Sequence, residues 1–191
     1  MPPQPMQPAY HSAQTDVTWA ASDTRRWLNG EFLDGFSQQE RERIAAVTVV
    51  NNNSPWDRGV HEPVSGGPDT QDGVFLLSID EALRYFGDSG LVADGAPMGG
   101  AGVRHAQEPE SPNHGIYSWG MHDRYSNARI AYDFDGLVSW WWLRSPGHIF
   151  GLAAAVSVDG GLFLSGAFVP QSGGVRPALW LLICSNSYKR P

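Results

Sequence analysis

Three consecutive tryptophans, Trp140 to Trp142, followed by Leu143 and Arg144, constrain the fold of this chain more than any other stretch. Side chains alternate between the two faces of a β-strand, so Trp141 should lie on one face and Trp140 and Trp142 on the other. Because tryptophan rings bury large apolar areas, we expect core packing for this block and at least one half-exposed ring.

A second apolar block that carries an arginine occupies residues 174–181. Arg144 and Arg176 each lie close to a proline in apolar surroundings, and a buried guanidinium needs carboxylate or carbonyl acceptors. We expect both arginines to brace the structure, and ligand contact is the alternative. The predicted framework residues are Trp141, Trp142, Arg144, Arg176 and Trp180.

The composition favours a compact domain of short elements. The chain has 191 residues, of which 41% are hydrophobic, with 22 glycines and 14 prolines. This length allows a real core, and so many turn formers disfavour long helices. The formal charge of −7 disfavours nucleic acid and anionic membranes as partners, and no apolar run is long enough for membrane insertion. Cys184 is the only cysteine, which excludes an intrachain disulfide.

Local patterns separate a polar lead-in from a folded domain. Residues 1–16 are rich in proline, glutamine and small polar residues, which predicts a disordered lead-in or linker, and the ligand-binding domain is expected over residues 17–191. The first residues lack the basic start and apolar core of a secretory signal. Localisation therefore stays open, with a virion or cell surface as the expected setting.

Two capping-box patterns predict two short helices. Ser37 with Glu40 opens a helix to about Ala46, and Ser78 with Glu81 opens one to about Phe86. Residues 22–30 predict a further short helix that ends at Asn29-Gly30 in the left-handed conformation. Strands and turns complete the pattern: strands over 17–19, 47–50, 74–77 and 116–119, a hairpin turn at 159–161, and long loops over 51–72 and 87–127.

Four blocks in order carry a family resemblance: RWLNGEF at 26–32, VFLLSIDEA at 74–82, WWLRSPG at 141–147 and GVRPAL at 174–179. The series resembles a widespread bacterial and phage domain allied to the C-type-lectin fold of the formylglycine-generating-enzyme type, and it spans residues 17–180. The resemblance implies an α+β, C-type-lectin-like fold in which two short helices flank twisted, mostly antiparallel sheets with long irregular loops.

Many such domains resemble the variable proteins of diversity-generating retroelements. There a reverse transcriptase copies a template with errors at adenines and rewrites the 3′ end of the gene, which implies receptor recognition of a protein or glycan ligand by a variable surface. Adenine substitution in an asparagine codon ending in C or T cannot yield Lys, Glu, Gln, Met or Trp. Residues 147–173 contain none of these except Gln171, so we expect this segment to be the variable region.

Within this segment, alternate residues are assigned to core and to binding surface. Ala154, Val156, Val158 and Val169 are expected in the core. Bulky apolar groups that are exposed together mark a binding site, and we expect Phe150, Phe163 and Phe168 as its anchors. The predicted ligand-binding residues are His148, Ile149, Phe150, Leu152, Ala155, Ser157, Phe163, Leu164, Phe168, Pro170, Gln171 and Ser172.

No catalytic residue, metal or cofactor is predicted. The related formylglycine-generating enzymes use a pair of cysteines, whereas this chain has Cys184 alone. The calcium motifs of sugar-binding C-type lectins are absent, and the scattered polar residues His105, His114, His122, Asp123, Asp133 and Asp135 match no ligand spacing. Two alternatives stay open: a fixed-sequence adhesion or carbohydrate-binding module, and an enzyme with a site in residues 87–127.

Overall fold

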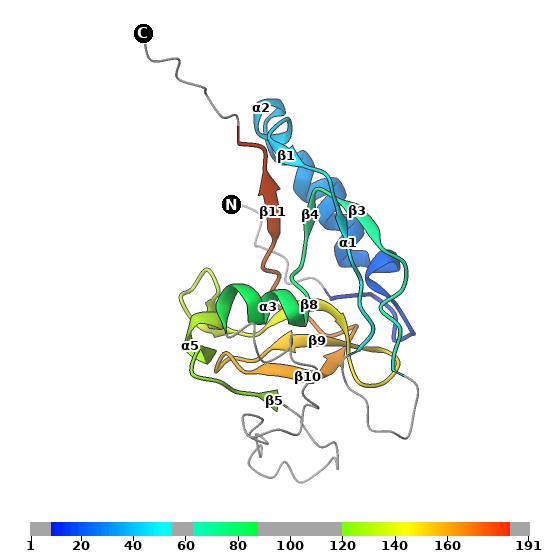
Figure 1. The fold of residues 1–191 in the computed structure, drawn as a ribbon, viewed down its shortest axis with the longest axis vertical. Helices are drawn as coiled ribbons and strands as arrows, with labels where there is room; N and C mark the ends of the chain where they lie inside the picture. Colours follow the sequence, from blue (N-terminus) through cyan, green and yellow to red (C-terminus); the bar gives the residue numbers. More distant parts are fainter. Residues whose placement is uncertain (1–8, 55–62, 88–119, 184–191) are drawn as a thin grey trace.

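Short helices and small antiparallel sheets make up the part of the chain that the computed structural model describes, residues 9–54, 63–87 and 120–183. The fold is therefore mixed α+β. Two groups of elements lie across one another: an upright group around β11 (Ala178–Leu181), and a lower group in which a four-stranded sheet runs across the direction of β11 (Figure 1).

The lower sheet has the strand order β5–β10–β9–β8, with all neighbours antiparallel. Since β9 is flanked by β10 and β8, all of its residues are buried. Helix α3 lies above this sheet (Figure 1) and buries Ile79, Ala82 and Leu83. The bounds are β5 (Gly120–Met121), β8 (Trp141–Pro146), β9 (Leu152–Val156), β10 (Leu162–Phe168) and α3 (Ile79–Phe86).

The tryptophan block behaves as strand alternation predicts. Trp141 is 1% exposed and Trp142 is fully buried, while Trp140 is half-buried. The Trp140 and Trp142 rings lie with centroids 4.7 Å apart in an edge-to-face arrangement, so they share one face of the strand. The expectation of at least one half-exposed tryptophan in this block is confirmed by Trp140.

The start of α3 is locked onto β8. Ser78 caps the helix, and Glu81 accepts a hydrogen bond from the Ser78 backbone N–H at 3.0 Å, which completes the predicted capping box. The Ser145 hydroxyl accepts from the Ile79 N–H at 3.0 Å, and the Arg144 guanidinium pairs with Glu81. Glu81 thus accepts hydrogen bonds both from the N-cap residue of α3 and from Arg144 of β8.

The upright group joins N-terminal helices to a three-stranded sheet in the order β1–β11–β4. Asn29 connects the two: its amide donates to the Val74 carbonyl at 2.8 Å and accepts from the Gly73 N–H at 2.9 Å. The elements are η1 (Trp19–Ala21), α1 (Asp23–Trp27), a wider turn η2 (Leu28–Phe32), α2 (Gln38–Arg41), β1 (Ile44–Ala45) and β4 (Val74–Phe75).

Two small strand pairs and one short helix complete the described fold. Two hairpin-like pairs are antiparallel, and a single helical turn precedes the second pair: β2 (Val47–Val49) with β3 (Thr70–Asp72), β6 (Ala131–Tyr132) with β7 (Val138–Ser139), and α5 (Ser126–Arg129).

Several predicted boundaries need correction. The helix opened by Ser37 ends at Arg41, because Ile44–Ala45 pair with β11 instead. Gly30 has a φ of −118°, so it does not end the first helix in the left-handed region. Residues 17–19 form no strand; a turn of 3-10 helix follows at 19–21. The strand predicted at 116–119 lies outside the described residues.

Residues 9–16 belong to the folded structure, contrary to the disordered lead-in predicted for 1–16. Tyr10 is 1% exposed, and its hydroxyl donates to the Arg144 carbonyl at 3.1 Å. The His11 N–H donates to the Val169 carbonyl at 3.0 Å. The buried Tyr10 ring and these hydrogen bonds, with that of the Gln14 amide to the Gly151 carbonyl at 3.1 Å, hold this polar segment against the core. Residues 1–8 lie outside the described part.

Candidate functional site

A cavity of about 600 Å³ lies on the face of the lower sheet that carries Trp140, within the roughly 300–1,000 Å³ typical of small-molecule sites. Of the described residues that line it, all except His122 and Trp140 fall within the predicted variable segment, 147–173. They are His122, Trp140, Ala155, Val156, Ser157, Val158, Asp159, Gly161, Leu162, Phe163, Ala167, Gln171 and Ser172.

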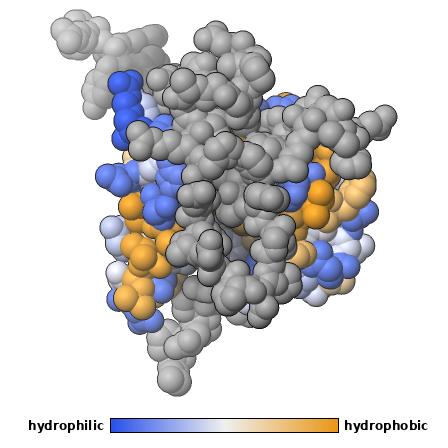
Figure 2. All heavy atoms as spheres, turned by 90° about the horizontal axis from the view of Figure 1, so that it is seen from below, coloured by the Kyte–Doolittle hydropathy of each residue, from blue (hydrophilic) through white to orange (hydrophobic). Residues whose placement is uncertain are grey.

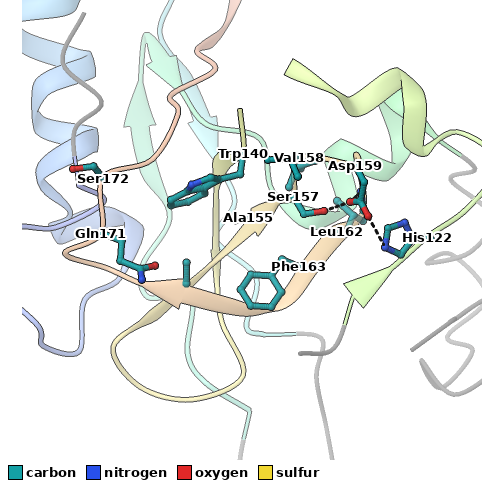
Figure 3. A pocket seen from close by; sticks show the side chains of 13 residues that line it. His122, Trp140, Ala155, Ser157, Val158, Asp159, Leu162, Phe163, Gln171 and Ser172 are labelled. Carbon is teal, nitrogen blue, oxygen red and sulfur yellow. Dashed lines mark hydrogen bonds and ion pairs between the residues drawn. The ribbon is translucent and has the colours of Figure 1, made fainter. Parts of the chain in front are cut away.

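The lining has an aromatic middle and two polar ends (Figure 3). The Trp140 and Phe163 rings lie in the middle, together with Ala155 of β9. Ser157, Asp159 and His122 gather at one end, and Gln171 and Ser172 lie at the other. An elongated ligand with an apolar body and polar groups at its ends would match this arrangement.

Asp159 is the centre of the first polar end. Its carboxylate accepts hydrogen bonds from the Ser157 hydroxyl and, at 3.1 Å, from the Gly161 N–H, and it lies 3.5 Å from His122 Nε2. Burial raises the pKa of Asp159, but these hydrogen bonds and the His122 imidazole outweigh it and leave that pKa below its usual value. The carboxylate is therefore ionised at neutral pH.

This serine, aspartate and histidine group is not arranged for nucleophilic catalysis. A serine nucleophile needs an imidazole on its hydroxyl, with the carboxylate behind the imidazole. Here the carboxylate lies between the other two, since Ser157 donates to Asp159 and His122 faces the second carboxylate oxygen. The group suits binding through hydrogen bonds and charge.

Arg129 fixes the turn that carries Asp159. The Arg129 side chain is fully buried; its Nε donates to the Gly160 carbonyl at 2.8 Å and its Nη2 to Asp123 at 2.8 Å. Its Nη1 also donates to the Phe86 carbonyl at 3.3 Å, which links the turn to the end of α3. Sequence reasoning missed this arginine because the short polar α5 around it carries no apolar pattern that indicates burial.

The two glycines of the turn allow this close packing, as the predicted hairpin turn at 159–161 requires. Gly160 has a φ of +79°, and a β-carbon there would collide with the Ser126 carbonyl. At Gly161 a β-carbon would overlap the His122 imidazole. The turn can therefore lie against α5 on one side and hold His122 beside the cavity on the other.

The structure divides the predicted binding surface. Ala155, Ser157, Phe163, Gln171 and Ser172 line the cavity, with Ala155 on its floor. A second set lies outside it: Ile149, Phe150 and Phe168 are 49%, 68% and 44% exposed, Pro170 is exposed, and the half-buried His148 ring lies 2.9 Å from the Ser165 carbonyl. Seen from below, hydrophobic residues gather on two opposite sides of the molecule (Figure 2).

Three residue assignments within the segment were wrong. Leu152 is 6% exposed because β9 is a middle strand, and Leu164 is 1% exposed because it alternates with Phe163 and shares the core face with Leu162. Val158 is 48% exposed because β9 ends at Val156 and the turn follows. The core assignments of Ala154, Val156 and Val169 are confirmed, since all three are fully buried.

Arg144 braces the structure as expected. It is 4% exposed, and besides Glu81 it donates to the Leu76 carbonyl at 2.8 Å and the Val50 carbonyl at 3.0 Å. Its guanidinium therefore connects β8, α3 and the loop after β2. Together with the buried Trp141 and Trp142, it forms the confirmed part of the predicted framework.

Arg176 and Trp180 differ from the framework prediction. Arg176 has no carboxylate partner within the described residues; its guanidinium carbon lies 4.5 Å from the Phe86 ring centroid and 5.2 Å from that of Trp141. Burial lowers the pKa of this guanidinium, and stacking on the two aromatic rings stabilises it. Trp180 is 51% exposed and contacts Tyr85 edge-to-face, because its strand lies at the surface.

The described ranges contain neither a metal-binding cluster nor a membrane-spanning helix. There, no three His, Cys, Asp or Glu side chains lie close enough to hold a metal ion, although His105 and His114 fall outside those ranges. No helix of the described residues is both long and apolar enough to cross a bilayer.

A family model matches residues 6–183 of the chain. The chain belongs to the DUF6273 family, a domain of unknown function. The DUF6273 match begins before Tyr10, which agrees with the burial of that side chain in the core. No curated protein and no solved structure shows significant similarity to the chain.

Proposed function

We propose that this DUF6273 domain is a non-catalytic binding protein whose ligand occupies the cavity between Trp140, Phe163 and the 157–161 turn. The observation that carries the proposal is the cavity itself, about 600 Å³ with an aromatic middle and hydrogen-bonding ends. Large pockets with apolar walls and few polar groups are the usual form of ligand sites.

We further propose that the cavity is diversified by a retroelement, in a C-type-lectin-like domain displayed on a phage or bacterial surface. Two features support this. The wall residues Ala155, Ser157, Phe163 and Ala167 come from the segment whose composition fits adenine mutagenesis. Arg129 and Arg144 each donate to two backbone carbonyls, and their side-chain acceptors Asp123, Ser126 and Glu81 do not line the cavity, so side-chain changes in the wall leave these contacts intact.

The C-type-lectin-like fold is part of this proposal. The four sequence blocks that carry the resemblance are accompanied by short helices and small, wholly antiparallel strand pairs in the described part. An experimental structure superposed on lectin-like domains would test the fold, and a different strand connection between β8 and β11 would contradict it.

The source locus tests diversification directly. We expect a near-copy of the segment encoding residues 140–181 next to a reverse transcriptase gene. Mismatches should be adenines in the copy and should fall on codons of the more exposed lining residues Ser157, Phe163 and Ala167. Codons of the buried Ala154, Val156 and Leu164 should match. A locus with no copy and no reverse transcriptase would leave a fixed binding site, which is the adhesion or carbohydrate-binding alternative.

Binding to the cavity can be tested with tryptophol, a neutral indole alcohol, as the probe. Its indole would stack in the aromatic middle, and saturation-transfer NMR should detect its binding. Phe163→Ser should abolish the signal, since it removes one aromatic wall of the cavity. Phe134→Ser is the matched control, because Phe134 is 85% exposed and does not line the cavity. An equal signal in both variants would contradict the site.

A further inference from the structure

We propose that the ligand of this cavity carries a positive charge, with a primary ammonium or guanidinium group that pairs with Asp159 and an apolar body between Trp140 and Phe163. The inference rests on the proposed binding function and names its ligand class. The chemistry is shared by a basic side chain of a partner protein and by a free organic amine.

The charge of the lining supports a cation. Among the described residues, Asp159 and His122 are the only ionisable groups that line the cavity, and no lysine or arginine of that part does. Ser157 and Gly161 donate to Oδ1 of Asp159, and Oδ2 lies 3.5 Å from His122 Nε2. Because the Asp159 side chain is 60% exposed, Oδ2 can accept from a ligand donor beside His122. The formal charge of −7 on the whole chain favours a cation further.

The aromatic middle supports the same ligand class. Cations bind favourably against the faces of tryptophan and phenylalanine rings, and tryptophan is the strongest of these partners. Trp140 and Phe163 lie along the cavity next to the Asp159 end (Figure 3). An anion would face both the negative ring faces and the ionised carboxylate, so the lining selects against it.

The opposite end adds a requirement on the ligand body. Gln171 and Ser172 are exposed, line the cavity and supply an amide and a hydroxyl but no charge. Such groups donate to and accept from neutral polar atoms, for example a peptide carbonyl or N–H. The favoured ligand therefore has its cation at one end and a neutral hydrogen-bonding group at the other.

Three probes with one indole body test the charge: tryptamine is a cation, tryptophol is neutral and indole-3-propionate is an anion. Titration calorimetry on the full chain should give an affinity for tryptamine roughly tenfold above that for tryptophol, as expected for a charge-assisted hydrogen bond. Indole-3-propionate should bind most weakly. Asp159→Asn should lower the tryptamine affinity to that of tryptophol and leave tryptophol unchanged, whereas Asp135→Asn, away from the cavity, should change neither.

The outcomes separate this inference from the proposed function. Equal affinities for tryptamine and tryptophol, or tryptamine binding that is insensitive to Asp159→Asn, would overturn the cation and leave the cavity as a neutral site. Failure of all three probes to bind would overturn both. A second arm uses N-acetyl-lysine methylamide and its Nε-acetylated form. Binding of the charged form alone indicates a protein side chain as the source, and preference for tryptamine over it indicates a free amine.

Discussion

The buried side chains that support the cavity and the side chains that line it differ in their hydrogen bonding. Among the supporting side chains, three donate to backbone carbonyls: Arg129 to that of Gly160, Arg144 to that of Leu76, and Tyr10 to that of Arg144. In the wall, Gln171 and Ser172 make no side-chain hydrogen bond within the described residues, and Ala155, Phe163 and Ala167 contribute apolar surface. Backbone acceptors are independent of residue identity, so the wall can change its side chains without loss of its support.

The largest expected effect is at Arg129. Arg129→Met should lower the free energy of unfolding by about 3–5 kcal/mol, because it leaves the Asp123 carboxylate, whose side chain is 9% exposed, without its buried partner. The control is Arg26→Met, whose side chain is 74% exposed in its pair with Asp23 and should change stability by less than about 1 kcal/mol. Urea unfolding measures the loss of stability in both variants. Similar losses would contradict the larger contribution expected of the buried Arg129–Asp123 pair.

Two neighbouring residues of β10 compare the core and the wall within one strand. Leu164→Ala should cost about 3 kcal/mol, since the side chain is 1% exposed in the core. Phe163→Ala should cost about 1 kcal/mol, because its ring borders an open cavity. A Phe163→Ala loss as large as that of Leu164→Ala would make Phe163 a core residue and weaken its role as a ligand anchor.

Removal of the Tyr10 hydroxyl tests whether residues 9–16 are anchored to the core. Tyr10→Phe leaves the Arg144 carbonyl without its donor and should cost about 1–1.5 kcal/mol in urea unfolding. Burial raises the pKa of the Tyr10 hydroxyl above its usual range, so it donates throughout the accessible pH range. Tyr132→Phe, at a side chain that is 67% exposed, should have no measurable effect. Equal stability of the two variants would contradict the inference that the Tyr10 hydroxyl anchors residues 9–16 to the core.

The smallest effect concerns Asp159 in the wall. Its pKa in the folded state is lowered, so its stabilisation is present above the unfolded pKa of roughly 3.9 and is lost as the pH falls through the folded value. Since the side chain is 60% exposed, the gain should stay below about 0.5 kcal/mol. Wild type should exceed Asp159→Asn slightly at pH 6 and match it near pH 2; a difference that grows as the pH falls would contradict the sign.

Local signals in the sequence were reliable where one short motif determines its own geometry. The capping boxes at Ser37 and Ser78, the glycine turn at 159–161 and the alternation of the tryptophans all occur as predicted. The carboxylate and carbonyl acceptors expected for Arg144 are present too.

The misses share a physical cause: they depend on contacts between segments far apart in the chain. Asn29-Gly30 is typical of a helix end, yet the Asn29 side chain donates a hydrogen bond to the Val74 carbonyl of β4. Tyr10 and Arg129 lie in polar stretches and are buried by partners more than 30 residues away. Leu152 and Leu164 were misassigned because their burial depends on the strands that pair with theirs: β9 lies between β10 and β8, and Leu164 shares the core face of β10 with Leu162.

Gly160 limits how this site can vary. Its carbonyl is held by Arg129, its φ is +79°, and the Ser126 carbonyl occupies the space of a β-carbon. An inserted or deleted residue in the turn would displace both contacts and the backbone conformation of Gly160 at once. Relatives with the same scaffold should therefore keep the length between β9 and β10 and differ by substitution alone. For protein engineering, the hairpin is a cassette of fixed length, suited to libraries that randomise side chains and unsuited to loop grafting.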